Sequence, residues 1–407
     1  MTASKQPPKP AEKRAKSTSA TSSATTTFEQ SREFERWLLE LTSLPTAAAR
    51  ESRVIAWIER WVKARAKSVE LSHDEFGNLL LHRAPRETKR SPVYITAHLD
   101  HPAFVVRRVA GRDVELEFRG GVHDPYFEKA KIEIFEHNER DGKDASHTAT
   151  ITKLDATAKP FKIVTARLTN ETTTICAGDI ARWKLPAPKI EKGILHTHAC
   201  DDLAAVAAAL CAFERIREMP ACGHVGLLFT RSEEIGFIGA IGAARSRSVP
   251  KDARLICLEN SRSFPESPIG AGPIVRVGDR ITVFSPDLTN RIAAIMGEYQ
   301  KTAPTFQWQR KLMPGGACEA SAFSCYGYSS TCLCLPLGNY HNMEDIDGVL
   351  AGKRPAKVGS EFIAISDFHG LITMLEIVAR DLDSASVPPL KDRMESLWRE
   401  HGGLLAR

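Results

Sequence analysis

Apolar residues recur at intervals of three and four positions in segments 31–44, 51–67 and 203–218, which predicts helices there. A glycine-containing stretch at 68–83 is typical of a hairpin. Four short apolar runs predict buried strands at 93–97, 224–230, 253–260 and 330–337. Because buried strands alternate with helices, we expect an α/β fold with a mostly parallel central sheet flanked by helices.

The pattern changes between about residues 105 and 188, where apolar and polar residues alternate and turn residues separate the runs. This alternation predicts a small all-β domain inserted into the α/β domain. The predicted organisation is a disordered basic tail at 1–27, an α/β domain at 28–104 and 189–385 that carries the chemistry, the inserted β domain at 105–188, and a C-terminal tail at 386–407.

The formal charge of +5 is concentrated in the N-terminal tail. Residues 1–27 carry five basic residues against the single acidic Glu12, or +4, so the rest of the chain is close to neutral and we expect no nucleic-acid partner. No apolar segment is long enough for a membrane span, and the N-terminus lacks the apolar stretch of a signal peptide, so we expect no membrane partner. Nine cysteines, without a Cys-x-x-Cys pair, are typical of reduced thiols and predict a cytoplasmic protein.

Histidine and acidic residues stand at the carboxyl ends of the predicted strands. They are His98 and Asp100, Glu233 and Glu234, Glu259, and His341, in chain order of the four strands, with Asp201 and Asp202 directly before the helix at 203–218. Sites in open α/β sheets form at the carboxyl ends of the strands, so these side chains are expected to converge. Two imidazoles and several carboxylates suit a pair of divalent cations of the zinc or cobalt type, bridged by a shared carboxylate. One of the two adjacent glutamates would bind metal while the other handles a proton.

His196 and His198 are rival ligands, because they precede the Asp201–Asp202 pair at alternating positions. Their spacing fits residues that flank a site better than residues that bind the metal. Each signal alone has an ordinary structural explanation, since adjacent glutamates are usually solvated and Glu259 could cap a helix. Their coincidence at the ends of strands indicates a site.

Six stretches carry a family resemblance, in this order: AHLD, GDIARWKLPAPKIEKGILHTHACDDLAAV, TRSEEIGFIGA, LENS, PGGACEASAF and LPLGNYHNMED. Over most of residues 30–380 the sequence resembles the dinuclear metallo-aminopeptidases of the glutamyl aminopeptidase and tetrahedral aminopeptidase type, within the co-catalytic zinc exopeptidases. The β insertion is similar to the family's second domain, which mediates assembly there. The resemblance therefore implies a homo-oligomer built from dimers, with a larger closed shell as an alternative.

The resemblance implies a metal-dependent aminopeptidase that removes N-terminal residues from peptides with two divalent metal ions, zinc or cobalt. It also implies a cis peptide bond between Asp201 and Asp202. The implied roles are His98 and Glu259 on one metal, Glu234 and His341 on the second, Asp201 as the bridge, Glu233 as the general base, and Asp100 as the residue that orients the His98 ring.

Four positions depart from the family pattern and leave the substrate preference open. They are Glu259 where Asp is usual, His101 where Glu is usual, Glu319 in a short insertion, and Tyr340 directly before His341. A related dizinc carboxypeptidase or N-acyl amide hydrolase is an alternative, although those relatives carry their insertion after the metal-binding glutamates. A catalytically idle metal-binding scaffold protein is a second alternative, and would be expected to have lost Glu233 or a ligand.

Overall fold

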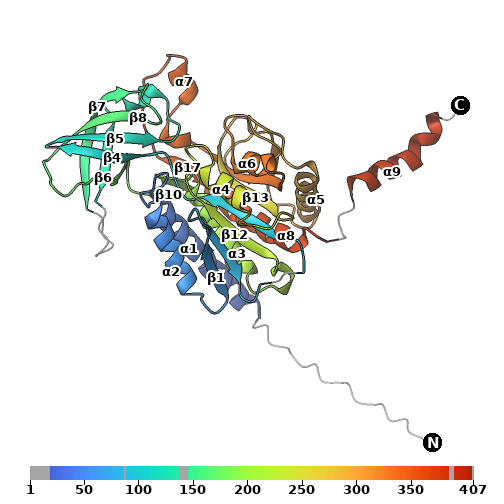
Figure 1. Cartoon of the computed structure of the whole chain (residues 1–407). Coiled ribbons are helices and arrows are strands. Elements are labelled where there is room, and N and C mark those ends of the chain that lie inside the picture. Colours follow the sequence, from blue (N-terminus) through green and yellow to red (C-terminus); the bar gives the residue numbers. More distant parts are fainter. Residues whose placement is uncertain (1–18, 87–88, 137–144, 385–388, 406–407) are drawn as a thin grey trace, which may run out of the picture.

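The computed structural model describes residues 19–86, 89–136, 145–384 and 389–405, which form an α/β body, a β-barrel and a projecting C-terminal helix (Figure 1). The predicted α/β class is confirmed. The first helix begins at Ser19, ahead of Phe28, where the sequence pattern predicts the start of order. Residues 1–18 of the predicted disordered tail lie outside the described residues. In the part of the chain described, no helix is both long and apolar enough to cross a membrane.

The central sheet has eight strands, and its inner four strands are parallel. These inner strands correspond to the four apolar runs of the sequence. Antiparallel pairing occurs toward both edges, at the β1–β2 hairpin and at β14. The strand order is β1 (Val69–His73), β2 (Leu79–Arg83), β12 (Val225–Thr230), β3 (Val93–His98), β13 (Arg254–Arg262), β16 (Ser329–Leu337), β14 (Ile274–Arg276) and β15 (Gln309–Lys311).

Helices cover both faces of this sheet. Successive side chains of a strand point to opposite faces, so each inner strand contributes to the core on both sides. In β12, Leu227 and Phe229 belong to the core of one face and Leu228 to the core of the other. The first face is covered by α1 (Ser19–Thr42), α2 (Ser52–Lys63), α3 (Leu203–Ile216), α5 (Pro286–Thr302) and α8 (Ile365–Asp381), and the second by α4 (Ile238–Ser246) and α6 (Glu319–Cys325). Helix α3 contacts α1, α8 and β3, so its small and apolar residues are buried almost throughout.

A small antiparallel sheet lies beside the central sheet and leads into the site. It consists of β10 (Lys189–Glu191), β11 (Ile194–Thr197) and β17 (Glu361–Ala364). Strand β11 runs directly toward the Asp201–Asp202 pair, and β17 begins with the buried Glu361. The sheet therefore joins two segments that are far apart in sequence at the edge of the site.

Six antiparallel strands close into a barrel between Ala103 and Trp183, close to the β domain predicted at 105–188. Its core contains the rings of Phe104, Phe118, Phe127 and Trp183, with centroids 4.8–6.0 Å apart. Helix α7 (Ile346–Leu350) packs on the same core. The strands are β4 (Ala103–Ala110), β5 (Asp113–Arg119), β8 (Lys162–Leu168), β7 (Ser146–Asp155), β6 (Lys131–Phe135) and β9 (Ile180–Trp183).

Candidate metal centre

The predicted site residues gather at the carboxyl ends of the inner strands. His98 ends β3, the two glutamates follow β12, Glu259 lies near the end of β13, and His341 lies in the turn after β16. Asp201 and Asp202 stand immediately before α3, joined by a cis peptide bond, as the family resemblance implies. Parallel strands end at the same edge of a sheet, so residues from distant parts of the chain meet there.

Asp201 lies at the centre of the cluster, with its two carboxylate oxygens facing two different imidazoles. Its Oδ1 is 3.4 Å from Nε2 of His98, and its Oδ2 is 3.4 Å from Nε2 of His341. Glu234 Oε1 lies 3.3 Å from the same His341 nitrogen, and Glu233 Oε2 lies 3.9 Å from Nε2 of His98. One carboxylate thus lies between two separate sets of nitrogen and oxygen atoms.

Potential ligand atoms form three overlapping groups whose members lie within 4.8 Å of one another. His98, Asp201, Asp202 and Glu259 form the first group; Asp201, Glu234 and His341 form the second; and His98, Glu233 and Glu234 form the third. Asp201 is shared by the first two groups, so it contacts both His98 and His341. Asp202 was not among the predicted ligands.

Both imidazoles are oriented by carbonyl groups, which fix the proton on Nδ1 and leave Nε2 free to bind a cation. His98 Nδ1 lies 3.1 Å from the carbonyl oxygen of Asp100, and its distance to Asp100 Oδ1 is 3.5 Å. His341 Nδ1 donates to the carbonyl of Gly121, at 2.6 Å. Gly121 follows strand β5, so the barrel segment helps to orient a ring of the histidine and carboxylate cluster.

The Asp100 carboxylate holds the two glutamates in place. Its Oδ1 accepts the backbone N–H of Glu233 and its Oδ2 accepts that of Glu234, both at 3.0 Å. Asp100 therefore contacts His98 mainly through its carbonyl group, while its side chain fixes the turn that presents Glu233 and Glu234. Sequence reasoning identified the residue but not this contact.

The site carries a large excess of negative charge, which the pKa shifts of its members report. Burial would lower the pKa of His98, yet Glu233 and the hydrogen bonds to Asp100 and Asp201 raise it well above its usual value. The pKa of His341 is likewise raised, because Glu234 and Asp201 outweigh the effect of burial. Burial raises the pKa of Glu259, and Asp201 raises it further. A cluster that attracts protons this strongly also attracts metal cations.

The residues present fit divalent metal ions. Asp201 Oδ1 and Glu234 Oε1 are buried and accept no hydrogen bond from the described residues. With Nδ1 of each imidazole already donating to a carbonyl, each Nε2 faces these carboxylate oxygens, and a bound cation would replace the proton between them. A cation between nitrogen and oxygen would satisfy both, and imidazole with carboxylate suits zinc or cobalt.

Two buried residues support the ligands through contacts that the sequence did not predict. Glu361 accepts the backbone N–H groups of Cys200 at 2.7 Å, Asp201 at 3.0 Å and His341 at 2.8 Å. Asp202 accepts the backbone N–H of His98 and the side-chain amide of Asn260, at 3.3 and 2.8 Å. Glu361 opens a short strand outside every motif, so no local signal points to it.

The rival histidines and two of the unusual positions, His101 and Glu319, lie outside the potential ligand groups of the described chain. His196 packs beside Phe362, and neither His196 nor His198 belongs to the potential ligand groups found among the described residues. His101 bonds through Nδ1 to the Asp201 carbonyl and lies 3.1 Å through Nε2 from Asn342 Oδ1. Glu319 is buried near Thr96, and burial raises its pKa to about 7.

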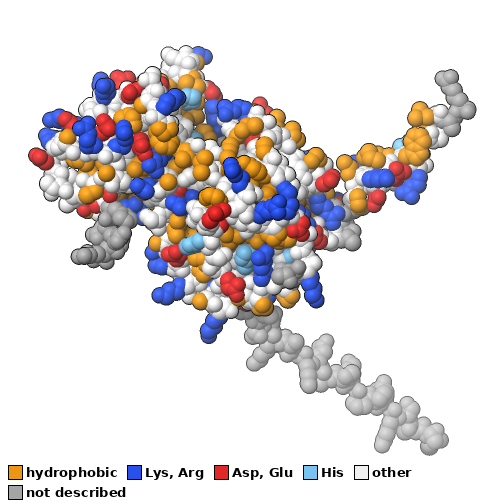
Figure 2. Space-filling model, in the orientation of Figure 1, with side chains coloured by type: hydrophobic (Ala, Val, Ile, Leu, Met, Phe, Trp, Pro, Cys, Tyr) orange, Lys and Arg blue, Asp and Glu red, His pale blue; other side chains and the backbone are white. Residues whose placement is uncertain are grey.

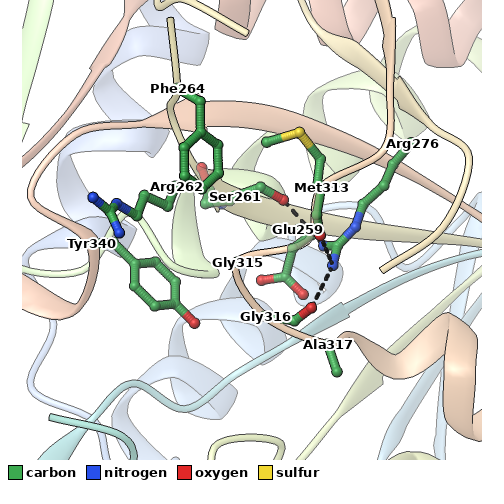
Figure 3. A pocket seen from close by; sticks show the side chains of 11 residues that line it. Glu259, Ser261, Arg262, Phe264, Arg276, Met313, Gly315, Gly316, Ala317 and Tyr340 are labelled. Atoms are coloured by element: carbon green, nitrogen blue, oxygen red, sulfur yellow. Dashed lines mark hydrogen bonds between the residues drawn. The ribbon is translucent and has the colours of Figure 1, made fainter. Parts of the chain in front are cut away.

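A small pocket with a cavity volume of about 20 Å³ opens beside Glu259. In Figure 3 the Glu259 carboxylate faces the side of the cavity where Tyr340 lies, and Arg276 approaches from the opposite side. Phe264 and Met313 also line the cavity. The buried Arg276 donates to Ser261 Oγ at 3.1 Å and to the Gly316 carbonyl at 3.3 Å, which ties the 313–317 loop to the sheet. Sequence reasoning did not identify this pocket.

Paired imidazoles and carboxylates at the carboxyl edge of an α/β sheet define the centre of a metal-dependent hydrolase. The model of the M42 glutamyl aminopeptidase family matches residues 77–351, and the chain belongs to this family. Family membership and the clustered ligand groups make the protein a metal-dependent aminopeptidase. This result favours the aminopeptidase prediction over the carboxypeptidase, N-acyl amide hydrolase and idle scaffold alternatives.

Several solved structures with a similar fold and low sequence identity are described as peptidases or aminopeptidases. The TET1 peptidase of Pyrococcus horikoshii, described as assembling into a tetrahedron or a large octahedral shell, has a TM-score of 0.68 and 18% identity, covering 86% of this chain and 99% of its own. An aminopeptidase from the archaeon Desulfurococcus kamchatkensis has a TM-score of 0.67 and 18% identity, covering 88% of this chain and 98% of its own. Comparison with curated proteins gives no match.

Proposed function

We propose that the cluster holds two divalent cations, zinc or cobalt, and that the protein uses them to release N-terminal residues from peptides. His98 and Glu259 would hold one ion, and Glu234 and His341 the other, with Asp201 shared between them. The observation that carries this proposal is the placement of the two Asp201 oxygens against two different imidazoles, each at 3.4 Å. A site for a single ion does not require that arrangement.

Glu233 is the residue best placed to move protons. When bound, the cations lower the pKa of a water molecule and polarise the carbonyl of the scissile peptide bond. Burial raises the pKa of Glu233, and the nearby Glu234 and Asp100 raise it further. A carboxylate with a raised pKa accepts a proton from the attacking water more readily, and can then return it to the leaving amine. Asp100 fixes the backbone of Glu233 for this purpose.

The pocket beside Glu259 would widen to receive the side chain of the N-terminal substrate residue, because its volume of about 20 Å³ holds little more than a water molecule. Phe264, Met313 and Tyr340 offer it apolar and aromatic surface. The substrate amino group would lie against the carboxylates of the centre, whose excess negative charge favours a free amine over an acylated one. This electrostatic preference supports aminopeptidase action at this site.

We further propose a homo-oligomer built from dimers in the cytoplasm. Solved structures with a similar fold are described as a dodecamer and as a tetrahedron or octahedral shell, which supports assembly. All nine cysteines are free thiols in the structure, which supports a reducing compartment.

Peptidase assays with Glu233→Gln test the function directly. The zinc- or cobalt-loaded protein is incubated with unblocked, N-acylated and C-terminally blocked dipeptides. We expect cleavage of substrates with a free amine, and a fall in kcat of roughly 10²- to 10⁴-fold in the variant, because its amide cannot accept the proton.

Glu376→Gln serves as the matched control, since Glu376 pairs with Arg215 on α3 and lies outside the ligand groups. It should keep wild-type activity. Both variants should retain the metal content of the wild type. Cleavage of acylated but not free dipeptides would overturn the aminopeptidase assignment, and full activity of Glu233→Gln would overturn its role as the base.

A further inference from the structure

Helix α9 (Leu390–His401) projects from the body (Figure 1). Its hydrophobic side chains are uncovered on the surface (Figure 2). Every residue of this helix is exposed, including Trp398 at 62% and Leu390 at 57%. The helix lies beyond residues 77–351, which match the family, and none of its residues belongs to the potential ligand groups of the described chain. Exposed apolar residues gathered along one helix are typical of an interaction surface.

The apolar residues of α9 follow the spacing of a coiled-coil seam. Steps of four and three positions connect Leu390, Met394 and Leu397, and a further step of four reaches the polar His401 at the end of the helix. In heptad notation these residues occupy positions d, a, d and a. The remaining exposed apolar residue of the helix, Trp398, occupies the neighbouring e position and widens the stripe. No residue of the described chain covers this face.

We propose that α9 pairs antiparallel with α9 of a second copy of this chain. Antiparallel pairing places Met394 of each copy opposite Leu397 of the other across the two-fold axis. At the flanking g positions it places Arg393 beside Glu400 of the second copy, twice by symmetry.

A parallel pair would lack this match. It would place Arg393 against Trp398, and Glu400 would face a position beyond the end of the helix, so no oppositely charged residues of the helix would face each other. The antiparallel arrangement also brings Lys391 across from Trp398, a favourable contact between a cation and an aromatic ring. Charge complementarity therefore selects both the partner, which is another α9, and its direction.

The polar residues of α9 argue against a membrane as the partner. Three basic residues, Lys391, Arg393 and Arg399, are balanced by three acidic residues, Asp392, Glu395 and Glu400. A helix that binds an anionic lipid surface carries an excess of Lys and Arg on its polar face. With twelve residues, α9 is about 18 Å long and buries too little surface to hold two copies together alone. It acts in addition to other contacts between copies, as a link at the outside of the assembly.

Charge exchange in the full-length chain tests the pairing. Particle mass is measured by sedimentation over a range of protein concentrations for the wild type, Arg393→Glu, Glu400→Arg and the double variant. We expect each single change to weaken association about tenfold, because it replaces two attractive contacts with two repulsive ones. The double variant exchanges the charges and should restore association.

Leu397→Asp removes the centre of the stripe and should abolish the α9-dependent species. Val283→Asp is the matched control, because Val283 is an apolar residue on the body that is 75% exposed. It should associate like the wild type, and peptidase activity per chain should be unchanged in both variants. Sedimentation of Leu397→Asp identical to wild type, failure of the double charge variant to recover, or pelleting of the wild type with phosphatidylserine vesicles in place of self-association would overturn the proposal.

Discussion

Replacing Glu361 with glutamine should weaken metal binding without touching a ligand. One oxygen of Glu361 accepts the backbone N–H groups of Cys200 and Asp201, and the other accepts that of His341. Glutamine has the same size, but one oxygen becomes an NH₂ group that faces an N–H donor. A hydrogen bond to a charged acceptor contributes about 1.5–3 kcal/mol. Losing one of these bonds, and placing the new NH₂ group against a backbone N–H group, therefore costs about 2 kcal/mol.

This cost should appear in metal affinity, because Glu361 aligns the bridging carboxylate with the His341 ring. Changes in residues that orient metal ligands weaken binding by about 10- to 100-fold, which agrees with the estimate from the hydrogen bonds. Calorimetric titration of the metal-free protein with zinc measures the effect. Peptidase activity at saturating zinc should recover most of the wild-type rate, because the ligands and Glu233 are intact.

Asp367→Asn provides a matched control for this experiment. Asp367 is a buried carboxylate that also accepts two backbone N–H groups, from Gly270 at 2.7 Å and Gly272 at 2.8 Å, in a loop outside the ligand cluster. It should bind zinc with wild-type affinity even if the protein is less stable. If Glu361→Gln binds zinc as tightly as the wild type, Glu361 does not position the ligands and the reasoning is refuted.

Three further predictions concern the bridge, the buried histidine and the pocket. Asp201→Ala should lose both metal ions whereas Glu259→Ala should retain one, as metal analysis of the dialysed proteins will show; equal losses would contradict a bridging role. Burial, with Arg182 and His101 nearby, lowers the pKa of His198 to about 3. The unfolded chain therefore takes up a proton below pH 6.5 that the folded protein does not, so stability falls as pH falls toward 3. His198→Asn removes this titrating group. In urea unfolding between pH 7 and pH 5, the free energy of unfolding of the metal-free wild type should fall by about 2 kcal/mol more than that of the variant. Parallel pH profiles of the two proteins would contradict this. Phe264→Ala should raise KM for substrates with a large apolar N-terminal residue more than for alanyl substrates; equal KM changes would place that residue elsewhere.

Much of the fold was predictable because burial on both faces leaves a clear mark in the sequence. The runs that became β3, β12, β13 and β16 are continuously apolar, as strands covered by helices on both sides must be. Their parallel pairing brings the residues that follow them to one edge, so His98 and His341 could be expected to meet. The barrel strands were equally predictable from the alternation of apolar and polar residues, since one face of each strand is buried.

The supporting contacts were not predictable, because they depend on how separate units pack. Glu361 reaches Asp201 across 160 positions of sequence, through a small sheet that no local pattern announces. Gly121 reaches His341 across 220 positions, and its carbonyl contributes without any side chain. The exposed stripe of α9 was also missed, since its spacing resembles that of a core-facing helix and only the structure shows that nothing in the described chain covers it.

Titration of the metal-free protein with zinc, followed by hydrolysis of an unblocked dipeptide, tests the central claim most directly. That claim is that the side chains around Asp201 hold two ions per chain and that this centre catalyses the reaction. The account predicts activity that rises until two equivalents of zinc are bound per chain, and then stays constant. A plateau at one equivalent, or activity that does not depend on zinc, would contradict it.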